Sequence, residues 1–208
     1  GGSVLYTGNP FVTVPTATTT YYVGAGSAGG THTTTYAAGN GSSGNAFTVK
    51  ALTNITITGF DGHTSTTTAG AWEIWYRPND YLLTPGSQTS NVGWTQLIAT
   101  PSIPAFGTGQ VTPITNALNL QIPAGATYSF QIFRPSGSVA YTNGGALGSL
   151  GSSNAALEVY QGHGGTAFAG MTIATRVWNG RIHYTAGCPT ARVPVTVVVN
   201  TADTIAIA

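Results

Sequence analysis

The chain has 208 residues, and charged side chains make up only 5% of them, against roughly 25% in an ordinary soluble domain. The formal net charge is +1, so no face can carry the strong field that favours nucleic acid or an anionic membrane as a partner. No apolar run reaches about 18 residues, so neither a transmembrane helix nor membrane insertion is expected. Because Thr, Ser, Asn and Gly must supply the polar surface, we expect an extracellular or cell-surface protein.

Short runs rich in Val, Ile, Thr, Tyr and Phe, which favour β-strands, follow one another along the whole chain. The sequence holds 29 glycines and 11 prolines, which interrupt it every few positions and leave no convincing helix. The predicted strands, in chain order, are Val4–Tyr6, Phe11–Val14, Thr19–Gly24, His32–Tyr36, Ala46–Lys50, Asn54–Phe60, Ala71–Arg77, Gly93–Ala99, Asn116–Ile122, Thr127–Phe133, Ser138–Tyr141, Ala155–Gln161, Gly180–Tyr184, Val193–Val199 and Thr204–Ile207.

Several of these runs alternate with a period of two, which marks a strand with one buried face. Ile55 and Ile57 share a face, as do Trp72 and Ile74, whereas Trp75 points the other way. Many short strands separated by turn signals predict an all-β chain with a β-sandwich or jelly-roll fold.

Glycine-rich stretches between the strands are predicted to be long loops. They are Gly24–Gly30, Gly39–Asn45, Asn143–Asn154 and Gly162–Gly170. The single cysteine, Cys188, has no partner for an internal disulfide, so it is a free thiol or an intermolecular bridge. Of these two, the inert thiol is the favoured interpretation.

Two segments near the ends of the chain resemble strands of immunoglobulin-like modules in secreted Bacteroidota proteins. Residues 18–23 read Thr-Thr-Thr-Tyr-Tyr-Val, and residues 187–197 read Gly-Cys-Pro-Thr-Ala-Arg-Val-Pro-Val-Thr-Val. Between them, residues 55–61 (Ile-Thr-Ile-Thr-Gly-Phe-Asp) and 122–128 (Ile-Pro-Ala-Gly-Ala-Thr-Tyr) are similar to a jelly-roll-like module of the same large surface proteins.

This resemblance implies three segments. Residues 1–26 and 186–208 would be terminal immunoglobulin-like strand segments, and residues 27–185 a jelly-roll-like β-sandwich. It also implies a multidomain cell-surface or secreted protein of the kind that includes adhesins and accessory regions of enzymes. It carries over no catalytic residue.

The ionisable residues do not form a recognisable catalytic or metal motif. Asp61 and His63 share a face of an extended segment, so an acid–base pair is conceivable, but a solvent-facing turn is favoured. Glu73 and Glu158 could serve a glycosidase only if the fold brought them about 5–10 Å apart. The four histidines, His32, His63, His163 and His183, are scattered. We therefore expect no enzyme activity, no bound metal and no cofactor.

Carbohydrate binding is the alternative to a structural role. Trp75, Trp94 and Trp178 offer flat faces on which sugar rings could stack, although sandwich cores also use large aromatic residues. Asn40 and Thr204 lie in short glycosylation-like patterns and are candidate modification sites.

The C-terminal run is the candidate for assembly. Val193–Val199 is charge-free and strongly β-prone, and such a strand at a sheet edge recruits another strand. It either pairs within its own sheet or completes the sheet of a neighbour, which repeated head to tail would build a filament. The expected partners are copies of the chain or other surface proteins. The side chains expected to fill the partner's core are Val193, Val195, Val197, Val199, Ile205 and Ile207.

Overall fold

The computed structural model describes residues 12–23, 28–187 and 193–199 of the chain. Contacts divide the protein into two units. One unit is Ala28–Gly187, and the other combines the terminal segments Gly1–Ser27 and Cys188–Ala208. No helix in the described part is long and apolar enough to cross a membrane.

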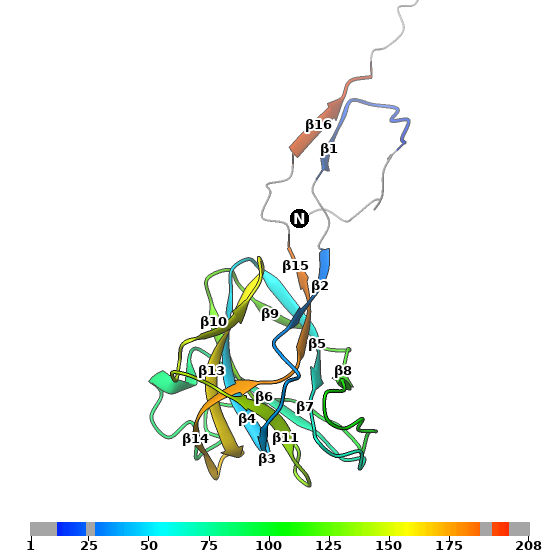
Figure 1. Ribbon diagram of the computed structural model, residues 1–208. Helices are drawn as coiled ribbons and strands as arrows, with labels where there is room; N and C mark the ends of the chain where they lie inside the picture. Colours follow the sequence, from blue (N-terminus) through cyan, green and yellow to red (C-terminus); the bar gives the residue numbers. More distant parts are fainter. Residues whose placement is uncertain (1–11, 24–27, 188–192, 200–208) are drawn as a thin grey trace, which may run out of the picture. The chain divides into compact units, whose positions relative to one another are not determined.

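The unit Ala28–Gly187 contains two antiparallel sheets (Figure 1). The nine-stranded sheet has the order β3 (Asn40–Ser42), β11 (Val139–Asn143), β14 (Gly170–Trp178), β13 (Leu157–Thr166), β4 (Gly44–Ala51), β10 (Thr127–Phe133), β6 (Glu73–Pro78) and β7 (Thr95–Ala99), with β12 (Leu150–Ser153) paired to β13. The five-stranded sheet has the order β2 (Ala28–Thr33), β15 (Arg181–Ala186), β5 (Ile55–Gly62) and β8 (Thr112–Thr115), with β9 (Leu120–Ile122) paired to β5.

One hydrophobic core lies between the two sheets and joins them. Phe47 from β4 stacks on Trp178 from β14 with ring centroids 4.4 Å apart. Phe60, from β5 of the other sheet, meets the edge of Trp178 at 6.0 Å and lies 5.3 Å from Phe130. Ile57 and Ile74 are also fully buried in this cluster. The all-β sandwich predicted from the sequence is therefore confirmed.

A second, smaller apolar cluster involves the loop between β6 and β7. This loop contains the 3₁₀ helix η1 (Tyr81–Leu83), and Tyr81 and Trp94 are buried with Ala46 and Met171. Asp80 caps η1 by accepting from the backbone N–H of Leu82, at 3.0 Å. Its carboxylate also accepts from the hydroxyl of Thr48 in β4, which ties the loop to the sheet.

Alternation placed the core residues correctly where strands are regular. Ile55, Ile57, Trp72 and Ile74 are buried, and Thr56 is half-buried on the opposite face of β5. The strand predicted at Thr127–Phe133 has those bounds in the structure.

The glycine-rich loop predictions were wrong in large part. Gly39–Asn45 contains β3 and the start of β4, Asn143–Asn154 contains β12, Gly162–Gly170 contains the end of β13, and Gly24–Gly30 contains the start of β2. Strands β3, β8, β12 and β14 were not predicted, and Val12–Val14 and Thr34–Tyr36 are not strands. The strand expected at Asn116–Ile122 is confined to Leu120–Ile122.

Close packing explains glycine inside these strands. A Cβ at Gly164 would lie 2.6 Å from the ring of Tyr141, and one at Gly162 would meet the carbonyl oxygen of Ala46. At these positions glycine permits close approach to neighbouring backbone or rings. The high glycine content that predicted loops therefore reflects strand positions where no space is left for a Cβ atom.

Trp178 is the strongest test of the core because both sheets contact it. We expect Trp178→Ala to lower the free energy of unfolding by about 3–5 kcal/mol, the usual cost of deleting a large buried aromatic residue. Trp75→Ala is the matched control, and its cost should be smaller because Trp75 is only half-buried. Urea denaturation of both variants measures the difference, and equal costs would contradict this description of the core.

Candidate functional site

The first candidate region is a two-stranded ribbon formed by the two ends of the described chain, here called the terminal ribbon. Strand β1 (Thr19–Val23) pairs antiparallel with β16 (Val193–Val197), with Tyr21 opposite Val195 and Tyr22 opposite Pro194. Directly opposed residues of an antiparallel pair share a face. Tyr21, Val193, Val195 and Val197 therefore lie on one face, which we call the valine face.

The terminal ribbon leaves large apolar side chains in solvent. Val193 is 62% exposed and Val195 45% exposed, and Tyr22 on the opposite face is 65% exposed. On that opposite face the hydroxyls of Thr20 and Thr196 lie 2.9 Å apart. Among the described residues, β1 and β16 pair only with each other.

The predicted assembly residues divide between described and undescribed parts of the chain. Val193, Val195 and Val197 lie in β16, and Val199 follows it, with its N–H donating to the hydroxyl of Thr18. Ile205 and Ile207 lie outside the described residues, as do Thr204, Cys188 and the strands predicted at Val4–Tyr6 and Thr204–Ile207.

The second candidate region is a row of polar side chains across three strands of the five-stranded sheet. His183 in β15 lies between Thr31 of β2 and Asp61 of β5. Its Nε2 is 2.9 Å from Asp61 Oδ2, and its Nδ1 is 3.1 Å from the hydroxyl of Thr31. The side chain of Asp61 is only 9% exposed, whereas that of His183 is 30% exposed.

A β-bulge in β5 brings Asp61 to the same face as His183. Strict alternation from Ile55 and Ile57 would turn Asp61 toward the core. Instead His183 pairs with Gly59 and Tyr184 with Ile57, so the register passes over Thr58. The bulge shifts the inward position to Phe60, which is buried, and the next side chain, Asp61, joins His183 on the outer face.

Arg181 and Tyr36 complete the surroundings of Asp61. The Arg181 guanidinium lies 4.0 Å from Asp61 Oδ2 and 5.6 Å from the centre of the Tyr36 ring. Burial, with the nearby Asp61 charge, raises the pKa of the Tyr36 phenol above its usual value. The phenol therefore stays neutral at physiological pH, and the Asp61 carboxylate forms its ion pair with Arg181 and a hydrogen bond with His183.

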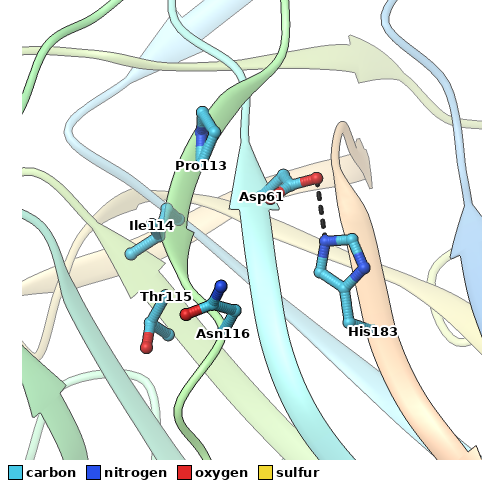
Figure 2. A pocket seen from close by; sticks show the side chains of 6 residues that line it. All are labelled: Asp61, Pro113, Ile114, Thr115, Asn116 and His183. Atoms are coloured by element: carbon cyan, nitrogen blue, oxygen red, sulfur yellow. Dashed lines mark hydrogen bonds and ion pairs between the residues drawn. The ribbon is translucent and has the colours of Figure 1, made fainter. Parts of the chain in front are cut away.

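A depression of about 410 Å³ lies beside this row. We call it the Asp61 pocket, and its lining residues are Asp61, Pro113, Ile114, Thr115, Asn116 and His183. Figure 2 shows Asp61 and His183 facing each other from adjacent strands, with the segment Pro113–Asn116 on the other side of Asp61. Gly59 allows that segment to lie close, because a Cβ there would be 2.8 Å from Cα of Asn116.

The catalytic pairs considered from the sequence are not formed. His63 is fully buried, and its Nε2 accepts from the backbone N–H of Gly109, while the Asp61 carboxylate contacts His183. Glu73 and Glu158 lie on β6 and β13, which are three strand spacings apart and offset along their length. Strand geometry separates these two residues by on the order of 20 Å, too far for a glycosidase pair.

Burial contradicts the prediction that sugar rings stack on Trp94 and Trp178. Trp178 is 1% exposed within the core, and Trp94 is 7% exposed, with the Arg77 guanidinium 5.6 Å from its ring centre. Neither offers a free face to a sugar. Trp75 is half-buried, and the Phe168 ring meets it edge-on at 5.0 Å. The stacking prediction is therefore wrong for Trp178 and Trp94, and it stays a prediction for Trp75.

Three histidines are buried away from the Asp61 pocket. Burial lowers the pKa of His32, His63 and His163 below the usual 6.5. His32 Nε2 lies 2.8 Å from the Ser152 hydroxyl, and His163 Nδ1 lies 2.8 Å from the Tyr81 hydroxyl. Within the described residues, no group of three His, Cys, Asp or Glu side chains could hold a metal ion.

Asn40 lies at the start of β3 and is exposed. Its side-chain amide donates to the Asn143 side-chain oxygen at 2.8 Å. Its glycosylation stays a prediction.

No family model and no curated protein matches the chain. Among solved structures, the chain is similar to infectious bursal disease virus particles of the Gx strain (12% identity, TM-score 0.22) and the Gt strain (15% identity, TM-score 0.20). It is also similar to the VP2 subviral particle of that virus (13% identity, TM-score 0.21). In each case 86% of this chain is covered, and the chain spans only 35%, 36% and 40% of the three viral chains, respectively.

The buried histidines predict an acid-sensitive sandwich. Because their pKa values are lower in the folded state than in the unfolded chain, the unfolded chain binds more protons as the pH falls below 6.5. Above pH 6.5 the titration of these histidines leaves the free energy of unfolding unchanged, and below that pH the free energy of unfolding falls progressively. We expect the thermal midpoint to fall between pH 7 and pH 5.5, and His163→Gln to reduce the fall. A midpoint that is constant over this interval would contradict the burial of neutral histidines.

Proposed function

We propose that this protein is an extracellular structural or adhesive protein that assembles through the terminal ribbon. The observation that carries the proposal is the exposure of Val193 and Val195 on a ribbon of only two described strands. An isolated two-stranded ribbon is marginally stable in water and usually needs a third strand or a packed face. Another chain or module that covers the valine face would supply that stabilisation.

The sequence of β16 suggests where a strand would be added. Pro194 has no backbone N–H, and proline is confined to edge strands of sheets. We therefore propose that β16 remains at an edge and that the incoming strand pairs alongside β1. The partner's apolar side chains would pack on Val193, Val195 and Val197. A copy of the same chain is the proposed partner, because a net charge of +1 opposes self-association only weakly.

The pairing of β1 with β16 supports the proposed kinship with immunoglobulin-like modules. The two motifs that resemble strands of such modules lie far apart in sequence, yet they pair with each other residue by residue from Thr19–Val197 to Val23–Val193. We propose that the sandwich is carried as an insertion between two strands of an incomplete immunoglobulin-like module. The missing strands would come from the partner, as in strand complementation.

Carbohydrate binding by stacked tryptophans is the weaker proposal. Only Trp75 keeps a partly open ring, and one platform gives little affinity without further aromatic contacts. We also propose that the chain is not an enzyme, because the carboxylate pairs considered from the sequence are not brought together. A structural role needs no such carboxylate pair.

Two neighbouring positions on β16 provide a matched test of assembly. Val195→Lys places a charge on the valine face, and Thr196→Lys places the same charge on the opposite face. We expect wild type and Thr196→Lys to form filaments or large oligomers and Val195→Lys to remain small. Burying an unpaired ammonium in an apolar contact costs several kcal/mol, which is enough to abolish assembly.

Negative-stain electron microscopy and sedimentation velocity of the full chain distinguish these outcomes. Far-ultraviolet circular dichroism checks that both variants retain the sandwich. Monodisperse wild-type protein at every concentration would overturn self-assembly. Equal loss of assembly in the two variants would show that the valine face is not the contact.

A further inference from the structure

The Asp61 pocket combines groups that hydrogen-bond without carrying a spare charge. Asp61 Oδ2 is occupied by His183, whereas Oδ1 has no hydrogen-bond partner among the described residues. Asn116 is exposed beside it and offers an amide that both donates and accepts. The volume of the Asp61 pocket, about 410 Å³, falls within the range of small-molecule sites. The walls are therefore suited to a small ligand with several hydroxyl groups.

The charges around the pocket disfavour an ionic ligand. A cation would compete with Arg181 and His183, which already lie 4.0 Å and 2.9 Å from Asp61 Oδ2. An anion would need a free positive group, but Arg181 faces the Asp61 carboxylate and the Tyr36 ring. Within the described part of the chain, the pocket lining contains no lysine or arginine.

Hydrogen bonds from neighbouring strands fix the orientation of His183. The Thr31 hydroxyl holds one nitrogen of His183 and the Asp61 carboxylate holds the other, so the imidazole cannot rotate without losing both contacts. This Thr–His–Asp row resembles the groups of a nucleophilic site. However, Thr31 lies on β2, on the far side of β15 from the pocket-lining segment of β8. Thr31 is therefore a positioning residue for His183, and a bound ligand would not reach its hydroxyl.

We propose that the Asp61 pocket binds an uncharged saccharide. Asp61 Oδ1 accepts hydrogen bonds from sugar hydroxyls, and the Asn116 amide donates to and accepts from adjacent hydroxyls. The Pro113 ring, exposed at the pocket rim, supplies an apolar surface for the C–H face of the sugar. The pocket belongs to the sandwich unit and uses no residue of the terminal ribbon, so separate variants test binding and assembly.

Titration of the full chain with uncharged oligosaccharides tests the proposal. Separate ligands built from glucose, galactose, mannose and N-acetylglucosamine are followed by isothermal calorimetry and by amide shifts in NMR spectra. We expect at least one of them to bind and to shift residues 113–116. Asn116→Ala should weaken binding about tenfold or more, since it leaves a ligand hydroxyl unpaired. Asp61→Asn should weaken it by a similar factor, because a neutral amide replaces the charged acceptor of the ligand hydroxyl.

Asn119→Ala is the matched control, because Asn119 is exposed and follows the same segment without lining the pocket. It should bind as wild type does, and so should Val195→Lys. Asp61 is nearly buried, so thermal denaturation accompanies its variant, while Asn116→Ala tests the same pocket from an exposed position.

Three results would overturn the inference. The first is that none of the saccharides binds at millimolar concentration. The second is that binding occurs but is unchanged in both Asp61→Asn and Asn116→Ala. The third is that a uronate-containing oligosaccharide binds more tightly and its affinity falls with salt, because that identifies an anion site.

Discussion

The sandwich depends on one aromatic contact between its two sheets, where Phe60 of β5 meets Trp178 and Phe130. Trp178 and Phe47 stack within the nine-stranded sheet and present a continuous aromatic surface to the other sheet. Each such aromatic pair contributes about 0.5–1.5 kcal/mol beyond the burial of its area. The same contact sets the Asp61 pocket, because Phe60 must point inward for the next residue, Asp61, to point outward. Packing of the core and placement of the candidate site therefore follow from one side-chain orientation.

Residue patterning predicted the sandwich but not this site. Alternation in residues 54–59 gives the correct inward side chains, Ile55 and Ile57, and the fold class follows from repeating such strands. The bulge at Thr58 reverses the alternation. Glycine is frequent at bulges, as Gly59 is here, but no local sequence pattern identifies this bulge. The sequence favoured a solvent-facing turn over an Asp61–His63 pair, whereas Asp61 and His63 are both buried. The actual neighbour of Asp61, His183, is brought close only by pairing of β5 with β15 across a long separation in the chain.

The errors in the glycine-rich segments have a related cause. Gly162 and Gly164 lie within β13, where backbone and the Tyr141 ring occupy the space that a Cβ would need. Sequence composition cannot distinguish a glycine kept for a turn from one kept for crowding, because the deciding atoms belong to distant strands. The register of β13 with β14 also shifts twice, so β14 lacks a clean two-residue period. Residue propensity alone therefore could not predict the full extent of β13 or the existence of β14.

Low charge raises the problem of how a chain that we propose to associate through strands avoids indiscriminate aggregation. Open edges of a sheet invite pairing unless they are short, interrupted or charged. In the sandwich, β3 is three residues long, and β8 carries Pro113, which removes one donor from an edge. Three other described strands, β1 of the terminal ribbon and the sandwich edges β2 and β7, contain neither proline nor a Lys, Arg, Asp or Glu side chain. What distinguishes the terminal ribbon from β2 and β7 is its apolar side chains, because Val193 and Val195 are exposed whereas no large apolar side chain of β2 or β7 is. An apolar face beside an open edge would direct the proposed association to the ribbon.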